Sequence, residues 1–289
     1  MSGRLRLGID GGGTGCRARL EDDRGRLLGA GMAGPATLRL GVEASLAAVL
    51  AAARMALAEA GLPEAALADI HAGIGLAGIG RPGMREAVAA AAAALPFAAA
   101  RIESDGLIAC LGAHGGADGG IVIVGTGSIA LARLKGREIR VGGYGFPISD
   151  EGSGADLGLR ALRAALRATD GRGETTPLLA ELMARFGHDP MEAVAWMDRA
   201  SATDYAVFAP LVMRHANLGD PAGRRIVQAA AGQLDALVRA LIDRGVTRIA
   251  LLGGLASAIE EWLSPDVRRR LVPPTGDGLA GALLLADGI

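Results

Sequence analysis

The chain has 289 residues, is 51% hydrophobic and carries a formal net charge of −1. This length is comfortable for two domains with a substantial core, and the balanced charge, almost all of its positive part arginine, gives no basic surface for nucleic acid. No uncharged stretch reaches the ~20 residues of a membrane span, and the N-terminus has no secretory signal. We therefore expect a soluble, cytoplasmic protein that acts on small molecules.

Hydrophobic periodicity predicts strands and helices that alternate in the first third of the chain, and mostly helices after residue 155. The expected order is strands at 4–9, 16–21 and 26–31, a helix at 42–60, a strand at 69–77, a helix at 83–95, a strand at 99–103, helices at 155–168, 176–186, 191–199, 204–216 and 220–244, a short helix at 257–263, a strand at 269–272 and a last helix from 277. The pattern predicts an α/β fold.

A glycine-rich motif occurs twice. "LGIDGGGTGCRARL" at 7–20 and "IVIVGTGSIALARL" at 121–134 both read as an apolar strand, a Gly/Thr turn and a second strand, and both end in Ala-Arg-Leu. We interpret this as an internal repeat. The simplest architecture is two related α/β domains, at 1–112 and 113–289, with a cleft between them and a last helix that can pack back on the first domain.

Two familiar phosphate-binding loops do not fit the first motif. A Walker-type loop needs a lysine after its glycines, but the only lysine, Lys135, follows no such loop. Gly13, Gly15 and Ala18 match a loose dinucleotide fingerprint, but that fingerprint must open a helix, and here the chain continues as a strand. Most Gly/Thr turns are only tight turns. A pair of them offers backbone N–H groups and threonine hydroxyls that could clamp a polyphosphate, and glycine is expected because only glycine adopts some turn conformations easily.

At this point the chain resembles the actin-like ATPase and sugar-kinase (ASKHA) superfamily, and within it the BadF-type family with its glucosamine and N-acetylglucosamine kinases. The resemblance extends over nearly the whole chain and is carried by these segments in order: "IDGGGTGCRARL", "GLAGIG", "ESDGLIACLGAHGG", "IVGTGS", "VGGYGFPISDEGSGADLGLRAL" and "ALLGGLA". The block "GGYGFPISDEGSG" is the most specific of them and is similar to the bacterial glucosamine-kinase branch.

The resemblance implies that ATP and Mg²⁺ are bound. The residues that match the family's nucleotide contacts are Gly12, Gly13 and Thr14 in the first turn, Gly125, Thr126 and Gly127 in the second, and Gly253 and Gly254 beside the adenine and ribose. Asp10 would hold Mg²⁺, which commonly takes one or two carboxylates plus phosphate oxygens. The alternative for Asp10 is a residue that caps the turn.

The resemblance also assigns a catalytic residue and a sugar site. Asp105 would orient the sugar hydroxyl and accept its proton; otherwise it would be a helix N-cap. The residues that match the family's sugar contacts are Thr37, Asp105, Gly143, Tyr144, Gly145 and Asp150. Related kinases usually have asparagine at the position of Thr37, and the motif leaves open whether Glu151 and Ser153 bind sugar or cap the following helix.

The function implied is an ATP-dependent amino-sugar kinase, a phosphotransferase that converts ATP and glucosamine to ADP and glucosamine 6-phosphate. One alternative is an N-acetylglucosamine kinase. A further alternative is a BadF-type ATPase that activates an electron-transfer partner through a cysteine-bound iron–sulfur cluster, although Cys16 and Cys110 do not form the expected pair. The expected partners are an amino sugar and ATP, with no nucleic acid and no membrane, and a homodimer is plausible from the family.

Overall fold

The computed structural model describes residues 4–289 and separates into two compact units. The first unit contains the described residues up to Gly119, together with Arg133–Glu138 and Pro273–Ile289. The second contains Gly120–Ala132 and Ile139–Val272. The chain thus leaves the first unit, builds the second, and returns to the first for its last segment.

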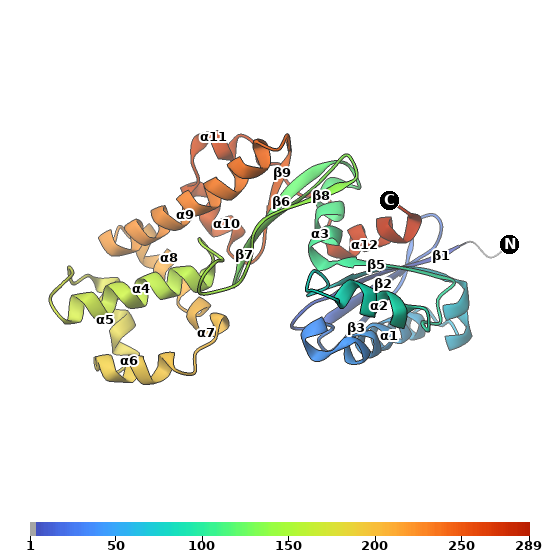
Figure 1. The fold of residues 1–289 in the computed structure, drawn as a ribbon, viewed down its shortest axis with the longest axis horizontal. Coiled ribbons are helices and arrows are strands. Elements are labelled where there is room, and N and C mark those ends of the chain that lie inside the picture. The colour runs from blue at the N-terminus through green and yellow to red at the C-terminus, as the bar shows by residue number, and fades with distance from the viewer. Residues whose placement is uncertain (1–3) are drawn as a thin grey trace. The chain divides into compact units, whose positions relative to one another are not determined.

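A five-stranded sheet in the order β3-β2-β1-β4-β5 forms the first unit (Figure 1). Its strands are β1 (Leu5–Gly11), β2 (Cys16–Glu21), β3 (Leu27–Ala33), β4 (Ile70–Leu76) and β5 (Ala99–Ser104). β1, β2 and β3 pair antiparallel, whereas β1, β4 and β5 run parallel. Parallel strands end at the same edge, so residues after β1, β4 and β5 are brought to one edge of the sheet.

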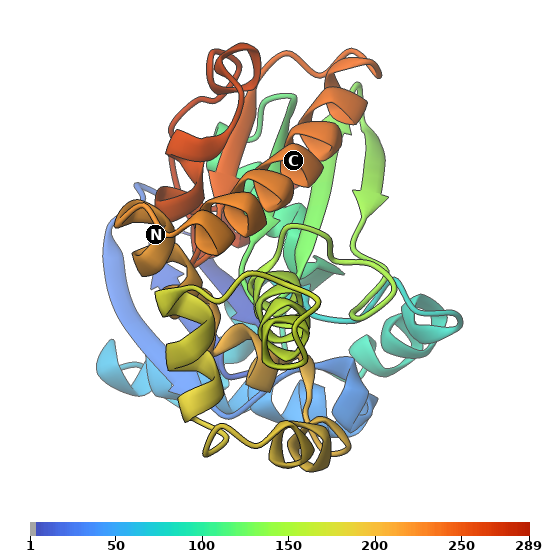
Figure 2. The same cartoon turned by 90° about the vertical axis from the view of Figure 1, so that its left-hand side faces the viewer.

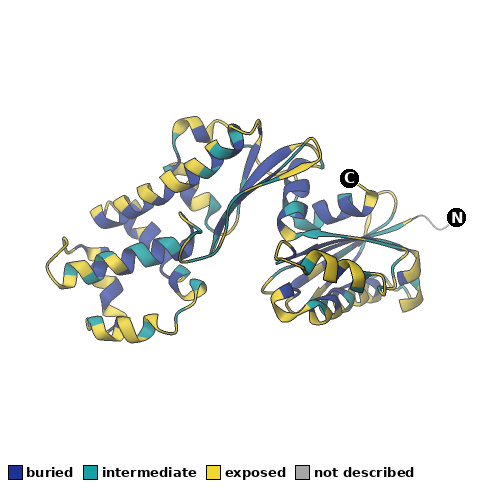
Figure 3. Ribbon diagram, viewed as in Figure 1, coloured by how far each residue is buried: buried dark blue, intermediate teal, exposed yellow. Residues whose placement is uncertain are grey.

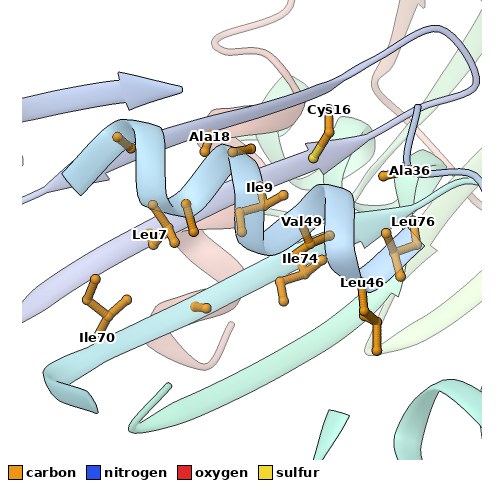
Figure 4. Close-up of a cluster of buried hydrophobic side chains, with 14 of the residues drawn as sticks. Leu7, Ile9, Cys16, Ala18, Ala36, Leu46, Val49, Ile70, Ile74 and Leu76 are labelled. Carbon is orange, nitrogen blue, oxygen red and sulfur yellow. The ribbon is translucent and has the colours of Figure 1, made fainter. Parts of the chain in front are cut away.

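Helices cover both faces of this sheet. They are α1 (Val42–Glu59), α2 (Met84–Ala92), α3 (Asp105–His114) and α12 (Gly278–Asp287), with 3₁₀ turns at Leu38–Leu40 and Glu64–Asp69. Figure 4 shows α1 packed over Leu7, Ile9 and Ile74 in the apolar core. α12 packs on the opposite face, where a Cβ atom on Gly73 would lie only 1.9 Å from the Ala282 carbonyl oxygen. Glycine on the strand therefore allows the helix to approach the sheet closely.

A four-stranded sheet in the order β8-β7-β6-β9 forms the centre of the second unit. Its strands are β6 (Gly119–Val124), β7 (Ser128–Leu134), β8 (Arg137–Gly142) and β9 (Ile249–Leu252). The order β8-β7-β6-β9 corresponds to β3-β2-β1-β4 of the first sheet, and β6 and β9 are parallel as β1 and β4 are. The two sheets thus share the topology that the repeated motif predicts.

Helices make up the rest of the second unit. They are α4 (Gly154–Thr169), α5 (Pro177–Ala184), α6 (Pro190–Met197), α7 (Ala202–Ala206), α8 (Ala209–Asn217), α9 (Pro221–Ile242), α10 (Ala256–Ile259), a 3₁₀ turn at Glu260–Trp262, and α11 (Pro265–Arg268). Figure 2 shows α9 lying across the sheet, where Leu237 and Leu241 face Gly142 and Gly120. Buried residues follow the sheets and the inner helix faces, whereas α2 and α6 are mostly exposed (Figure 3).

Aromatic side chains hold the helical part of the second unit together. Trp196 contacts Tyr205, Phe208 and Phe186 at ring-centroid distances of 4.8, 5.5 and 5.6 Å. Phe146, from the loop after β8, packs on Tyr205 at 5.0 Å. Aromatic pairs at these distances contribute about 0.5–1.5 kcal/mol beyond their area burial. The cluster therefore anchors that loop to the helices.

Three details of the sequence-based assignment are wrong. The helix expected at 204–216 is two helices, α7 and α8, because Pro210 occupies the first turn of α8 and cannot continue a preceding helix. The strand expected at 269–272 is reduced to one isolated bridge, between Ile249 and Leu271, after the short helix α11. β8 was not expected, because charged residues interrupt its apolar pattern. Within residues 4–289, no helix is long and apolar enough to cross a membrane.

Candidate functional site

The first glycine turn joins β1 to β2 and is open at its tip. The Gly12 amide donates to the Gly15 carbonyl at 2.9 Å, which leaves Gly13 and Thr14 exposed at the end of the hairpin. A Cβ atom on Gly13 would meet no other atom within 4 Å. Gly13 does not adopt the left-handed conformation that favours glycine. The expectation that this turn needs the conformational freedom of glycine is therefore wrong. The missing side chain leaves free space at the tip of the turn.

Asp10 precedes this turn and forms a cross-strand ion pair. Asp10 is the register partner of Arg17, and the Arg17 guanidinium donates to its carboxylate at 2.6 Å. A Cβ atom on Gly278, at the start of α12, would lie 3.1 Å from the same carboxylate. This hydrogen bond to Asp10 is the main reason that the pKa of Arg17 is raised. Arg17 thus fixes the position of the Asp10 side chain at the edge of the sheet.

A magnesium ion fits Asp10 only in one way. Within residues 4–289 there is no group of three His, Cys, Asp or Glu side chains that could enclose a metal. A single aspartate is nevertheless sufficient where nucleotide phosphates and water supply the other oxygens. Asp10 alone would therefore fit a Mg²⁺ ion only together with a bound nucleotide, and it would then share its charge between the ion and Arg17.

The second glycine turn joins β6 to β7 and is supported from below. The Gly125 amide donates to the Gly127 carbonyl at 2.9 Å, and the Gly154 amide at the start of α4 donates to the Gly125 carbonyl at 2.8 Å. Ala155 donates to the Thr126 carbonyl at 3.1 Å. The first turn of α4 and the second glycine turn therefore form one connected structure.

Gly127 lies directly against Asp150. A Cβ atom on Gly127 would be 2.5 Å from the Asp150 carboxylate, although the backbone of Gly127 is not left-handed. Here too the expected reason for glycine is wrong. Close approach of Asp150 requires it, and this contact joins a residue predicted to bind phosphate to one predicted to bind sugar.

The Gly253–Gly254 turn follows β9 and contacts the end of β6. Gly253 has a φ of 101°, and a Cβ atom on it would lie 2.3 Å from the Val124 carbonyl oxygen. The Leu255 amide donates to that same oxygen at 3.0 Å. Since Val124 immediately precedes Gly125, this turn and the second glycine turn lie side by side within the second unit, with Gly254 exposed.

Asp105 is the first residue of α3, and it is not the cap. Ser104 is the N-cap, because its hydroxyl accepts from the Leu107 amide at 3.0 Å. The Asp105 carboxylate accepts from the adjacent Gly106 amide at 2.9 Å. The alternative role of Asp105 as the capping residue is therefore filled by its neighbour.

The environment of Asp105 favours its protonated form more than water does. Desolvation by the surrounding protein raises the pKa of Asp105, and the negative charge of Asp10 acts in the same direction. The residue nevertheless keeps solvent-accessible surface, so a substrate can reach it. Asp10 is the last residue but one of β1 and Asp105 directly follows β5, which places both at the same edge of the sheet.

Thr37 lies at this edge as well, but its hydroxyl is turned toward the backbone. Its Oγ1 accepts from the Arg39 amide at 3.4 Å and lies 3.5 Å from the carbonyl oxygen of Ala77, just after β4. The side chain is buried, with 8% of its surface exposed. The first unit thus brings together Asp10, Thr37, Asp105 and the first glycine turn.

The remaining sugar-site residues lie in the loop after β8, in the second unit. Gly143 and Gly145 have φ of 70° and 107°, and Asp150 has a φ of 64°. The Asp150 carboxylate accepts from the Gly145 amide at 3.1 Å. Partial burial raises the pKa of Asp150, and the charge of Glu151 adds to this effect. Tyr144 is 73% exposed.

The structure separates the roles of Glu151 and Ser153. Ser153 is the N-cap of α4: its hydroxyl accepts from the Asp156 amide at 3.2 Å, and the Asp156 carboxylate accepts from the Gly152 amide at 2.9 Å. The Ser153 hydroxyl thus caps the helix. Glu151 has an exposed side chain, and its carbonyl accepts from the Ser128 hydroxyl at 2.7 Å. Ser153 is therefore structural.

Sequence reasoning missed Arg17 as the partner of Asp10. The signal was present, since a two-residue turn at Gly13 and Thr14 sets the register that places Arg17 opposite Asp10. Both thiols are buried, with 0% of Cys16 and 1% of Cys110 exposed. Burial raises the pKa of Cys16 to about 12 and that of Cys110 to about 11. Burial thus favours the neutral thiol form of both residues.

Known proteins resemble this chain over nearly its whole length. The model of the BadF/BadG/BcrA/BcrD ATPase family matches residues 7–286. The glucosamine kinase GspK of Vibrio cholerae is 40% identical, over 97% of this chain and 95% of its own. A Chromobacterium violaceum crystal structure, solved under a provisional N-acetylglucosamine kinase name, is 38% identical with a TM-score of 0.87, over 99% of this chain and 100% of its own.

A more distant structure shares the fold. The ROK family glucokinase of Streptomyces griseus, in complex with glucose and AMPPNP, is 19% identical with a TM-score of 0.53, over 98% of each chain. The α/β fold expected from the sequence is therefore confirmed as that of the actin-like sugar kinases.

Proposed function

Because the chain belongs to the BadF/BadG/BcrA/BcrD ATPase family, we propose that it is an ATP-dependent kinase that phosphorylates the 6-hydroxyl group of glucosamine. The observation that carries the proposal is the state of Asp105. It stands at the end of a strand beside Asp10, it is accessible, and Ser104 relieves it of the capping role. A carboxylate without a structural task at this edge is suited to catalysis.

In the proposed reaction, the Asp105 carboxylate accepts a hydrogen bond from the sugar 6-hydroxyl and orients its oxygen toward the γ-phosphorus of ATP. The new O–P bond forms as the bond to the ADP oxygen breaks, and the hydroxyl proton passes to Asp105. Phosphoryl transfer depends mainly on positioning and on neutralising charge, so a base is needed late and a strongly raised pKa is not required.

The two glycine turns would bind the polyphosphate. Gly12, Gly13 and Thr14 offer amides and a hydroxyl at an open tip, and Gly125, Thr126 and Gly127 offer the same groups from a turn fixed on α4. Gly253 and Gly254 would face the adenosine. Asp10 would hold Mg²⁺, which supplies positive charge to the phosphates when bound. An ATP-dependent kinase of this kind would act in the cytoplasm.

Glucosamine is favoured over N-acetylglucosamine by the carboxylate of Asp150. It is partly buried and lies in the loop predicted to bind the sugar, where it can pair with an ammonium group. An acetamide would leave that carboxylate without a positive partner. A site with an unpaired buried charge binds such a substrate much more weakly. N-Acetylglucosamine is the second candidate, because a similar structure carries that provisional name.

A coupled assay of ADP release tests the proposal, with glucosamine, N-acetylglucosamine, N-acetylmannosamine and glucose as acceptors. We expect the highest kcat/KM with glucosamine. Equal turnover of glucose would contradict an amino-sugar site, and a preference for N-acetylglucosamine would select the second candidate. ATP hydrolysis that no sugar stimulates would contradict the kinase proposal as a whole.

A further inference from the structure

The loop that follows β8 needs to be held in place if it is to bind a sugar. Residues 143–150 include no helix or strand. Gly143 and Gly145 add backbone freedom, and ordering such a segment costs conformational entropy. Tyr144 and Ile148 are 73% and 87% exposed, so apolar burial of these two side chains contributes little. Other contacts must therefore fix the loop.

Arg140, on β8, makes three contacts with the residues that follow it. Its Nε donates to the Gly142 carbonyl oxygen at 3.2 Å, and its Nη2 donates to the Gly143 carbonyl oxygen. Its guanidinium carbon lies 5.1 Å from the centre of the Tyr144 ring. Gly142 and Gly143 have φ of 68° and 70°, so both are in the left-handed region. A single side chain thus binds three consecutive residues at the start of the loop.

We propose that Arg140 is a positioning residue of the sugar site. Its planar guanidinium binds two carbonyl oxygens and a ring face at once, and this fixes the backbone of Gly143 to Gly145 before any sugar binds. The proposal rests on the proposed function for the identity of the ligand. Arg140 itself need not contact the sugar.

Other contacts secure the far part of the same loop. The Gly145 amide donates to Asp150, the Ser149 amide donates to the Gly145 carbonyl at 2.9 Å, and Phe146 packs on Tyr205. At the β8 end, where Gly142 and Gly143 turn the chain, the Tyr144 amide donates to the Ser149 hydroxyl at 3.2 Å. That bond joins one part of the loop to another, whereas Arg140 joins the loop to β8, so loss of Arg140 would release Gly143 and Tyr144 first.

The chemistry of the side chain makes the role specific to arginine. Lysine keeps the positive charge, but its ammonium group cannot present two parallel N–H donors or stack on a ring as a plane does. Arg140→Lys therefore separates positioning from simple charge. Arg137→Ala is the matched control, because Arg137 is an exposed arginine at the other end of the same strand.

Hydrogen exchange on the substrate-free protein tests the positioning without relying on any activity. We expect the Tyr144, Gly145 and Ser149 amides to exchange about tenfold faster or more in Arg140→Ala, since two charge-assisted hydrogen bonds are lost. Arg140→Lys should resemble Arg140→Ala, and Arg137→Ala should resemble the wild type. Unchanged exchange in Arg140→Ala would overturn the proposal, and full rescue by lysine would overturn its geometric basis.

Steady-state kinetics on the same variants test the link to the sugar. We expect the sugar KM to rise by about tenfold in Arg140→Ala, with kcat and the KM for ATP within about twofold of wild type. Faster loop exchange with an unchanged sugar KM would show that the loop is not part of the sugar site. A wild-type enzyme inactive on every sugar would defeat the proposed function, while the exchange result would still decide the role of Arg140.

Discussion

The two glycine turns come from equivalent strand pairs, yet they differ in what lies behind them. Behind the first turn is a charged pair, Asp10 and Arg17, and its tip is free of neighbours at Gly13. The second turn rests on the first turn of α4 and meets Asp150 at Gly127. The first is thus organised around charge and the second around packing, although their sequences are alike.

The sheets behind the turns differ in the same sense. The first has a fifth strand, β5, and Asp105 follows it; the second stops at β9 and is completed by helices. The elements that the two units share carry the predicted phosphate contacts. The predicted base follows β5, which only the first unit has, whereas predicted sugar contacts follow the equivalent strands β3 and β8 of both units.

The largest effect is expected at Asp105, on the strand that only the first unit has. Asp105→Asn keeps size and leaves the Ser104 cap intact, but an amide cannot accept the hydroxyl proton. We expect kcat to fall on the order of 10²–10⁴-fold, with ATP affinity and melting temperature near wild type. Measurements of all three on one preparation check this.

Ser104→Ala is the control for Asp105. It removes the cap hydroxyl, which typically costs about 0.5–2 kcal/mol of stability, and should lower the melting temperature while kcat stays near wild type. A folded Asp105→Asn enzyme that retains more than about a tenth of wild-type kcat would rule out the base role.

The second turn should be the more sensitive of the two to a bulky residue. In Gly127→Val the new side chain would collide with the Asp150 carboxylate, and such overpacking typically costs about 1–3 kcal/mol. We expect a lower melting temperature together with weaker binding of both an ATP analogue and the sugar. Calorimetric titration with each ligand measures this, and an unaffected sugar affinity would argue against coupling through Asp150.

Gly13→Val should act on the nucleotide alone. The position is open, so the variant should melt as the wild type does, while its branched side chain occupies space that a phosphate would use. We expect the affinity for a non-hydrolysable ATP analogue to fall about tenfold and the sugar affinity to persist. If this folded variant binds the nucleotide as tightly as the wild type does, the first turn does not contact the phosphates and is only structural.

The smallest effect concerns the pH dependence of stability through Asp150. Burial raises its pKa, so the folded protein holds this proton more tightly than the unfolded chain does. The stabilisation is complete at low pH and is lost as pH rises through the raised pKa. Asparagine carries no charge at either pH, so the stability of Asp150→Asn minus that of the wild type should be larger at pH 7 than at pH 4. The change should be less than about 1 kcal/mol, because solvent screens this partly exposed group. Thermal melts of both proteins at both pH values measure this difference. A smaller difference at pH 7 than at pH 4 would show that folding lowers the pKa of Asp150.

Much of the first unit could be predicted because its strands are short apolar or alternating runs and glycine marks its turns. The predicted bounds of β1, β2 and β4 agree with the observed ones within two residues, and Asp10 and Asp105 follow from their positions at strand ends. The failures arise where tertiary contacts decide. Neither the cap at Ser104 nor the contact between Gly127 and Asp150 can be read from local periodicity, because each depends on atoms whose position is set by the folded chain.

The docking of α12 under β1 has a consequence for biosynthesis. The helix that covers one face of the first sheet, and whose start adjoins Asp10, emerges from the ribosome only after the entire second unit. At ~5–20 residues per second, the apolar face of β1 and β4 waits on the order of ten seconds for its cover. A nascent chain of this protein therefore carries an uncovered sheet face in its first unit until residues 278–287 have been made, a window in which chaperones would be expected to act.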